Sequence, residues 1–454
     1  MTVLTVMHSA TKYKWYLLLA FAGFFFSSCS IQQKIAKSSG TLIHNAALQN
    51  AHIGICLYEP AAHAYWYGYQ QDKYFTPASN TKILSCYAAM KYLKDSIPAL
   101  QYLENDTALF VIPAGDPTFL HPDYKNQPAV RFLQKTKKKI YITGENWKDD
   151  AWGSGWSWDD YNGDYMAERS PLPVYGNVIR WIQLTDTSEE AVLTNRQTTS
   201  VFSEPEVNWN VTFNTNPHDS VFRVERKLMQ NDFLITEGKE TYAEQQVPFI
   251  TDTIRSSLEL LKDTIGKDIN STNKNLPGLR HTIFSQPLDS MLKPMMHRSD
   301  NFFAEQSLLM VSNKLFGEMN DEKIIDTLLK TDLKDLPQKP VWADGSGLSR
   351  YNLFTPQDFT FILDKMKNDF GMKRIESIFP TGGTGTIRNY YKADSGYIFA
   401  KTGSLSGVIA LSGFLYTKKN KLLIFSVLVN NHQSAPYLIR RAVEKYLEGV
   451  RNNY

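Results

Sequence analysis

A serine and a lysine that could react together lie three residues apart, at Ser79 and Lys82. Residues at this spacing share one face of a helix, so the lysine amine can lie beside the serine hydroxyl. An alcohol next to an amine is a candidate activated nucleophile, because the amine can accept the hydroxyl proton during attack on an acyl carbon. This chemistry requires an element that holds both side chains in place.

A buried helix is predicted to hold the pair. An extended run ends at Pro77, and the following residues predict a helix from Ala78 to about Lys94. Ser79 would lie in its first turn, where backbone N–H groups have no partner within the helix. The helix carries an apolar stripe made of Ile83, Leu84, Tyr87, Ala88 and Leu93.

The same serine–lysine spacing also begins at Ser9, Ser271 and Ser290. Ser9 precedes a predicted export signal, and Ser271 lies in a polar run that indicates a loop. Ser290 is followed by Pro294, which is expected to break a helix soon afterwards. Only Ser79 combines a proline entry with a long amphipathic continuation, so we expect it to be the nucleophile.

A second motif, Ser299-Asp300-Asn301, directly precedes another helical run. Its hydroxyl and amide could face the serine–lysine pair from the other side of a cleft. Ser299 would relay a proton and assist Lys82, which would act as the base, and Asn301 would clamp the substrate through its amide. Taken alone, the tripeptide would fit an ordinary turn equally well.

A third motif, Lys401-Thr402-Gly403, ends an apolar strand and occurs once in the chain. Lys401 would present a fixed cation to a substrate carboxylate, Thr402 would add a hydroxyl, and Gly403 would let the substrate backbone approach. The backbone N–H groups of Ser79 and Ser404 could form an oxyanion hole, in which one donor typically contributes ~10²–10³ in rate. The three motifs in this order indicate one catalytic site.

The composition describes a folded protein with more than one domain. A chain of 454 residues exceeds one ordinary core, so two or three domains are expected. Its 43% hydrophobic and 21% charged residues are those of a folded soluble body. The net charge of +3, without a block of like charges, gives no support for nucleic acid as a partner.

Residues 1–28 are predicted to be a signal peptide. After a positively charged start, the apolar run from Trp15 to Phe26 has 12 residues, too few to span a bilayer comfortably. Small residues and Cys29 follow, an arrangement that resembles a bacterial lipoprotein box. Cys29 is therefore predicted to carry a lipid that anchors the protein to a membrane, with residues 29–39 as a polar tether. A plain signal peptide and an uncleaved anchor are the alternatives.

Two other cysteines are present, Cys56 and Cys86. Both lie in apolar, regular segments, which favours buried free thiols, although an exported protein could also pair them. No CxxC, HExxH or His-Cys cluster occurs in the chain, so a metal site has no support.

The periodicity changes twice along the chain. Two strand-like runs precede the helix that carries Ser79. From residue 103 to about residue 279, short strand-like runs alternate with loops and are interrupted by one helical run at 250–265, which predicts an inserted, mostly β module. Helices resume at about residue 287, and the chain ends in a strand, a turn, a strand and a last helix.

Further stretches make a family resemblance specific. They are Pro77-Ala78-Ser79, Gly-Asp-Pro-Thr at 115–118, Gly-Trp-Ser-Trp-Asp-Asp-Tyr at 155–161 and Asp-Gly-Ser-Gly-Leu-Ser-Arg-Tyr-Asn at 344–352. S-x-x-K, S-x-N and K-T-G are typical of serine β-lactamases and penicillin-binding proteins. With these additions the chain resembles the class C low-molecular-mass penicillin-binding proteins, the D-alanyl-D-alanine carboxypeptidase/endopeptidase family. The separation of 217 positions between Lys82 and Ser299 is similar to the large insert of this family.

The resemblance implies an α+β fold in which a β-lactamase/transpeptidase-like domain, an antiparallel sheet flanked by helices, is built from residues 40–105 and 283–454. Residues 106–282 would form the mainly β insert. It implies a serine peptidase of the bacterial cell envelope, on the periplasmic side, that cleaves peptidoglycan stem peptides at D-Ala through an acyl-enzyme and is inhibited by β-lactam antibiotics such as penicillin. The implied catalytic residues are Ser79, Lys82 and Ser299, and the substrate-binding residues are Asn301, Lys401, Thr402, Gly403 and Ser404. The resemblance implies neither a metal nor an organic cofactor.

Two other functions stay open. A serine β-lactamase or esterase could use the same motifs, but the insert and the absence of a G-x-S-x-G elbow argue against it. A non-catalytic envelope protein of the same fold could bind glycan without cleaving it. The presence of all three motifs argues against that function.

Overall fold

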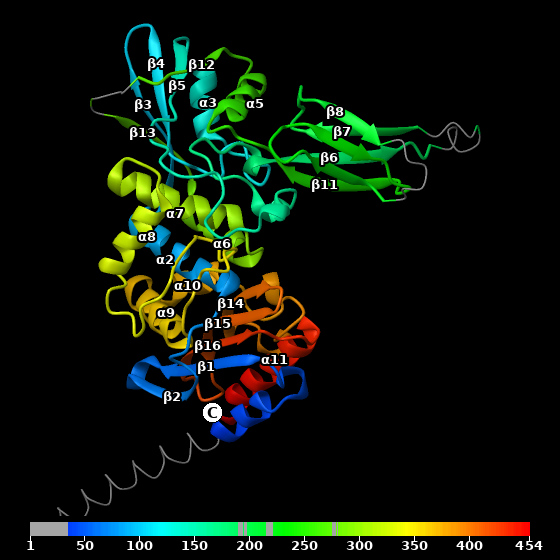
Figure 1. Cartoon of the computed structure of the whole chain (residues 1–454). Coiled ribbons are helices and arrows are strands. Elements are labelled where there is room, and N and C mark those ends of the chain that lie inside the picture. Colours follow the sequence, from blue (N-terminus) through cyan, green and yellow to red (C-terminus); the bar gives the residue numbers. More distant parts are fainter. Residues whose placement is uncertain (1–34, 189–193, 195–197, 215–220, 275–277, 279) are drawn as a thin grey trace, which may run out of the picture.

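The computed structural model describes residues 35–454, apart from 189–193, 195–197, 215–220, 275–277 and 279 (Figure 1). The predicted signal peptide and Cys29 lie outside the described residues. In the described part of the chain, no helix is both long and apolar enough to cross a membrane.

An antiparallel sheet of five strands lies at the centre of the lower half of Figure 1, in the order β14-β15-β16-β1-β2. Strand β1 pairs with β16, so the two ends of the described chain complete one sheet. The inner strands β15 and β16 are buried almost throughout, which requires cover on both faces. The strands are β1 (His52–Glu59), β2 (Ala64–Tyr69), β14 (Ile398–Leu405), β15 (Val408–Tyr416) and β16 (Leu422–Asn430).

One face of this sheet is covered by α11 (Pro436–Asn453) together with a helix at residues 35–43. Ile35 and Leu42 are fully buried in the cluster that α11 shares, and the Ser39 hydroxyl donates to the Tyr446 hydroxyl at 3.1 Å. The tether predicted for residues 29–39 therefore does not extend over residues 35–39, because apolar residues spaced for a helix dock there.

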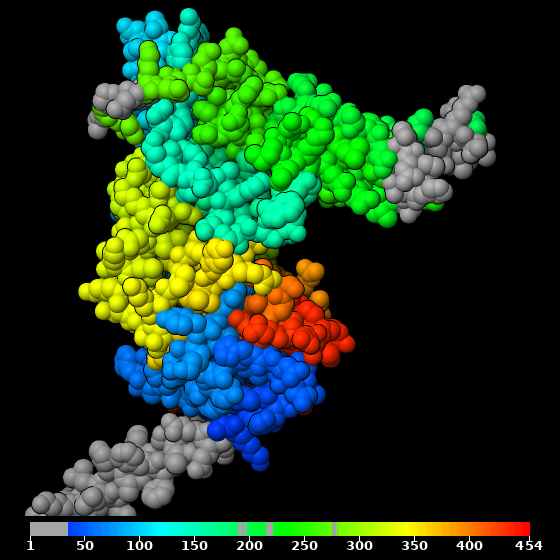
Figure 2. Space-filling view, in the orientation of Figure 1, coloured from blue at the N-terminus to red at the C-terminus, as the bar shows by residue number. Residues whose placement is uncertain are grey.

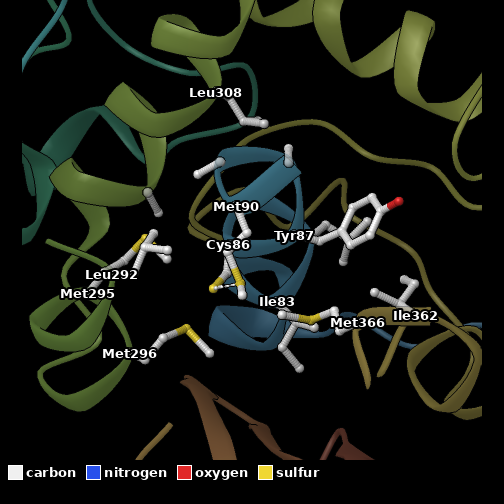
Figure 3. Packing of buried hydrophobic residues seen from close by; sticks show 14 of the residues in the cluster. Ile83, Cys86, Tyr87, Met90, Leu292, Met295, Met296, Leu308, Ile362 and Met366 are labelled. Atoms are coloured by element: carbon white, nitrogen blue, oxygen red, sulfur yellow. Dashed lines mark hydrogen bonds between the residues drawn. The ribbon is translucent and has the colours of Figure 1, made fainter. Parts of the chain in front are cut away.

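The other face is covered by helices that surround α2 (Figure 3). Every residue from Lys82 to Met90 of α2 is buried, and side chains of α6, α7 and α9 pack around it. An antiparallel sheet flanked by helices confirms the predicted α+β class. The helices are α2 (Lys82–Tyr92), α6 (Leu288–His297), α7 (Asn301–Phe316), α8 (Asp321–Lys330), α9 (Pro356–Phe370) and α10 (Met372–Ile378).

The insert contains a second five-stranded sheet, in the order β12-β5-β4-β3-β13. Strands β4 and β5 are parallel and are joined through α3 (Pro128–Lys135), a helix that the sequence reading missed, and α5 (Arg255–Ile265) packs nearby. Strand β3 belongs to this sheet, so the chain enters the insert at Ser96, ahead of the boundary at 105, and leaves it at Pro287. The strands are β3 (Ser96–Glu104), β4 (Ala108–Pro113), β5 (Lys139–Ile142), β12 (Ile269–Ser271) and β13 (His281–Pro287).

A β arm projects sideways from the insert (Figure 1). It consists of two three-stranded sheets, β11-β6-β7 and β8-β10-β9. Figure 2 shows that the surface is hollowed between this arm and the C-terminal segments below it. The strands are β6 (Val178–Thr185), β7 (Thr199–Glu204), β8 (Val211–Asn214), β9 (Arg223–Arg226), β10 (Phe233–Thr236) and β11 (Tyr242–Pro248).

Two local expectations have clear outcomes. Cys56 and Cys86 are free and buried, as the apolar segments predicted. The prediction that Pro294 breaks the helix is wrong. Helix α6 continues through Pro294 to His297. A proline leaves the carbonyl four residues earlier without its helical donor, and here that carbonyl, of Ser290, accepts from the Tyr124 hydroxyl at 3.0 Å. Ser290 is exposed, and its hydroxyl donates to the Pro287 carbonyl at 2.6 Å.

Candidate active site

Ser79 and Lys82 lie at the junction of a 3₁₀ turn, Ala78–Thr81, with helix α2. Side chains three residues apart eclipse one another in a 3₁₀ turn, so this first turn brings the two groups together. The Lys82 Nζ donates to the Ser79 Oγ at 2.9 Å. Ser79 is half-buried and Lys82 is fully buried, so the hydroxyl can be reached while the amine is shielded from water.

The amine of Lys82 is held by three acceptors from different parts of the chain. Besides the Ser79 hydroxyl, Nζ donates to Asn301 Oδ1 at 2.6 Å and to the Ser346 carbonyl at 2.8 Å. Burial lowers the pKa of Lys82 to about 8, although nearby carboxylates oppose the decrease. A lysine with this pKa can accept a proton near neutral pH.

Ser299 and Asn301 face Lys82 from the start of α7. The Asp300 carboxylate caps the helix by accepting from the Phe303 backbone N–H at 3.0 Å, and Ser299 just before it has a left-handed φ of 63°. This turn leaves Asn301 at the first helical position, with its amide Nδ2 donating to the Tyr165 carbonyl of the insert at 2.9 Å. Asn301 is therefore fixed between the insert and Lys82.

Lys401 comes from strand β14 and is fully buried. Its Nζ donates to the Ser299 hydroxyl at 2.8 Å and to the Thr402 carbonyl at 2.7 Å. Burial, together with the charge on Lys82, holds the pKa of Lys401 well below the usual lysine range. The structure thus joins the second and third motifs through one hydrogen bond.

The next residues of β14 lie beside the turn that carries Ser79. A Cβ on Gly403 would lie 2.6 Å from the Pro77 carbonyl, so only glycine lets this strand pass so close to the turn that carries Ser79. Thr402 is half-buried, and Ser404 is exposed with its hydroxyl accepting from Arg440 Nη2 at 2.9 Å. Hydrogen bonds and close packing therefore join six of the eight predicted residues around Ser79. The other two side chains have different neighbours: Thr402 lines a small cavity with Ile387, and Ser404 contacts α11 through Arg440.

The loop from Asp344 to Gly347 also borders the site, although it was not among the site residues predicted from the sequence. The Asp344 carboxylate accepts from the backbone N–H groups of Gly347 at 2.8 Å and Ser349 at 2.7 Å. A Cβ on Gly347 would lie 1.9 Å from the Ala78 carbonyl, so the loop packs directly on the turn of Ser79. This contact fixes the Ser346 carbonyl that binds Lys82.

Glu305 is a second group that was missed. It is fully buried, lies one helical turn after Asn301 on α7, and its Oε1 accepts from the Ser346 backbone N–H at 2.7 Å. Burial raises the pKa of Glu305 to about 7, and the Arg169 guanidinium opposes this increase. The i, i+4 spacing from Asn301 was the available signal, since it places both side chains on one helix face.

A cavity of about 430 Å³ is lined by Ser299 and Asn301 together with His121, Tyr165 and Tyr175 of the insert. Its volume is in the range of small-molecule sites. Among the described residues, no group of three or more His, Cys, Asp and Glu side chains is placed to hold a metal ion. The groups gathered at Ser79 are suited to acyl transfer, in which a hydroxyl attacks and an amine takes its proton.

The chain matches the D-Ala-D-Ala carboxypeptidase 3 (S13) family over residues 35–450. It is 29% identical over 158 residues to the D-alanyl-D-alanine carboxypeptidase DacB of Haemophilus influenzae, which covers 33% of each chain. It is 31% identical over 163 residues to the carboxypeptidase DacB of Mycolicibacterium smegmatis, which covers 32% of this chain and 34% of the relative. These matches span about a third of the length of the curated relatives.

Solved structures resemble the whole fold. The crystal structure of penicillin binding protein 4 from Haemophilus influenzae superposes with a TM-score of 0.70 at 19% identity, covering 92% of this chain and 98% of that one. A predatory endopeptidase, Bd0816 from Bdellovibrio bacteriovorus, superposes with a TM-score of 0.51 at 16% identity, covering 88% and 94%. At these identities the likeness concerns the fold, and the family match extends over nearly the whole described chain. The chain therefore belongs to the D-Ala-D-Ala carboxypeptidase 3 (S13) family.

Proposed function

We propose that the protein is a serine D-alanyl-D-alanine carboxypeptidase/endopeptidase that cleaves peptidoglycan stem peptides through an acyl-enzyme and is acylated by β-lactam antibiotics. One observation carries the proposal: the buried Lys82 amine lies 2.9 Å from the hydroxyl of Ser79, which remains accessible. Family membership supports the substrate class, because the family is described by its action on D-Ala-D-Ala.

Acylation begins when Ser79 Oγ attacks the carbonyl carbon of the penultimate D-Ala and Lys82 Nζ takes the hydroxyl proton. The carbonyl oxygen becomes an oxyanion, which the backbone N–H groups of Ser79 and Ser404 would stabilise. The close approach of Gly403 to the Pro77 carbonyl supports this role, because it brings the two segments together. A proton reaches the leaving amine through Ser299, the C–N bond breaks, and D-Ala leaves. Water then attacks the ester, which releases the shortened peptide and restores the Ser79 hydroxyl.

The terminal carboxylate of the substrate would be read by the third motif. Lys401 supplies positive charge, and Thr402 supplies a hydroxyl on the adjacent position of β14. Because Lys401 is fully buried and already contacts Ser299, we infer that its charge acts over a short distance and that hydroxyls make the direct contacts. A carboxylate would also raise the pKa of Lys401, since an opposite charge favours the protonated amine.

The cell envelope is the proposed location, since peptidoglycan lies there. The signal-peptide pattern of residues 1–28 and the lipoprotein-like position of Cys29 support export followed by lipid anchoring. The mature domain would then work on the periplasmic side, held to a membrane by its N-terminal lipid.

A fluorescent penicillin tests the proposed function. The purified protein should form a stable covalent adduct that maps by mass to Ser79, and the Ser79→Ala variant should stay folded without forming it. Digestion of purified muropeptides should release D-Ala or separate cross-linked dimers. An adduct on Ser271 or Ser290 would show that the nucleophile is misassigned, and rapid turnover of penicillin without muropeptide cleavage would identify a β-lactamase instead.

A further inference from the structure

A stretch of the insert, residues 149–169, reaches the catalytic machinery at three separate points. Trp156 Nε1 donates to Asp344 Oδ2 at 2.9 Å, and the Tyr165 carbonyl accepts from Asn301 Nδ2 at 2.9 Å. The third point is Arg169, whose guanidinium lies against Glu305 at 3.5 Å. Asn301 contacts the Lys82 amine directly. Asp344 and Glu305 both contact Ser346, whose carbonyl binds that amine.

Arg169 is almost completely buried, with 2% of its side chain exposed. Its guanidinium pairs with three carboxylates: Asp149 of the insert at 2.8 Å, Glu305 of α7, and Asp321 at the start of α8. A buried cation among carboxylates ties the elements that carry them, because separating any one of them leaves a charge without its partner. Arg169 therefore fastens the insert to α7 and α8 immediately behind the site.

Glu305 connects Arg169 to the Asp344–Gly347 loop, which binds the Lys82 amine. Its Oε2 faces Arg169, and its Oε1 accepts from the Ser346 N–H at 2.7 Å. The carbonyl of the same residue, Ser346, accepts from Lys82 Nζ at 2.8 Å. A path of three contacts thus leads from an insert arginine to the amine beside Ser79.

Trp156 supports the same loop from its other end. The Asp344 carboxylate that receives the indole N–H also accepts from the backbone of Gly347 and Ser349. A Cβ on the neighbouring Gly155 would lie 2.7 Å from Ser349 Oγ, so the insert packs tightly on this loop. The loop is therefore held directly by Trp156 at Asp344, and at Ser346 by Glu305, which pairs with Arg169.

We propose that residues 149–169 of the insert are a positioning element of the active site, in which Arg169 and Trp156 fix the Asp344–Gly347 loop and thereby place the Lys82 amine for proton transfer. This inference rests on the proposed function and extends it, because it assigns a catalytic purpose to the insert. Neither residue touches the reacting atoms, so each acts through the loop.

Charges around Lys82 give a readout that simple destabilisation would not alter. The charged groups that interact with its amine are Glu305 of α7, Asp300 just before α7, Asp344 of the loop and Lys401 of β14. The three carboxylates raise the pKa of Lys82 against the effect of burial. Removing the charge of Glu305 should therefore lower the pH at which acylation reaches half its maximum, whereas a loss of stability alone would leave that pH unchanged.

The experiment measures the acylation rate constant with a fluorescent penicillin, normalised to the amount of protein that is finally labelled. Trp156→Phe is compared with Trp209→Phe, since both indoles are half-buried and Trp209 donates only to Glu259 within the insert. Arg169→Lys is compared with Arg180→Lys, because Arg180 is an insert arginine whose carboxylate partners, Glu204 and Glu244, lie outside residues 149–169. Thermal unfolding of every variant is recorded in parallel.

We expect Trp156→Phe and Arg169→Lys to slow acylation about 10-fold or more beyond their controls, as partial loss of a positioned proton transfer that is typically worth ~10²–10⁴. Glu305→Gln should move the acylation midpoint to lower pH. Rates equal to those of the controls, with an unchanged midpoint in Glu305→Gln, would overturn the inference. If Arg169→Lys fails to fold, the Trp156 pair and Glu305→Gln still decide. A wild-type protein that is not acylated at all would instead refute the proposed function.

Discussion

Acylation should depend on pH through Lys82, and the expected midpoint follows from the site. Burial lowers the pKa of Lys82 from 10.5 to about 8. At pH 7.5 an amine with a pKa of about 8 is roughly one quarter unprotonated, whereas a lysine of pKa 10.5 is unprotonated in about one molecule in a thousand. Burial therefore supplies about 200-fold more free amine at this pH.

The direction of the pH effect follows from the role of a base. Only unprotonated Lys82 can accept the Ser79 proton, so the acylation rate should be highest above about pH 8 and should fall about tenfold for each pH unit well below it. The assay is the second-order rate constant for a fluorescent penicillin from about pH 5.5 to 9.5. Thermal unfolding over the same range separates loss of reactivity from loss of fold.

Two variants complete this test. Lys82→Ala should slow acylation by ~10²–10⁴ and remove the pH dependence near 8, because the titrating base is gone. Ser299→Ala should slow acylation by a smaller factor and keep the midpoint. A wild-type rate that stays constant across the range, or an unchanged profile in Lys82→Ala, would refute the assignment of Lys82 as the base.

Three further predictions concern other parts of the chain. Lys401→Ala should lose about 10- to 100-fold in kcat/KM on an acyl-D-Ala thioester of mercaptoacetate but little on the matching thioester of mercaptoacetamide, because a positive charge roughly 6–10 Å from a carboxylate contributes about 2–3 kcal/mol at an effective dielectric constant of about 20; equal losses would show that Lys401 does not recognise the carboxylate. Gly347→Ala should slow acylation and lower the melting temperature more than Gly266→Ala, because both have positive φ but only Gly347 would meet a backbone oxygen, at 1.9 Å; equal effects would contradict the close packing. Cys29→Ser should release the protein from membranes into the soluble envelope fraction, which fractionation and blotting can follow, and retention at high salt would point to an uncleaved anchor.

The predicted site could be read from sequence because its chemistry lies in three short motifs. Ser79 and Lys82 are joined by a local turn, and Asp300 caps the helix that starts with Asn301. These local patterns are visible in single stretches of chain. Their assembly across more than three hundred positions required the family resemblance, since neither spacing nor periodicity alone predicts that Lys401 would meet Ser299.

The supporting residues could not be predicted because their roles depend on distant partners. Glu305 looks like any helix residue until Ser346 and Arg169 are seen to contact it. Strand β3 reads as part of the first domain along the chain, but it pairs with β13 from the far end of the insert. Pro294 misled the reading of α6 because the donor that replaces the lost hydrogen bond, Tyr124, lies far away in sequence.

Burial lowers the pKa of both Lys82 and Lys401, and this lets one lysine act as the base while the other carries the positive charge. The charge of Lys82 helps to hold the pKa of Lys401 well below the usual range, while Glu305, Asp344 and Asp300 raise the pKa of Lys82. When no substrate carboxylate is bound, Lys82 therefore has the higher pKa of the two lysines and is the one that is protonated first. A carboxylate beside Lys401 would raise the pKa of Lys401, and a proton there would lower that of Lys82. The substrate's own charge thus favours the free amine that acylation requires, which is why the loss in Lys401→Ala should be confined to the thioester that carries a carboxylate.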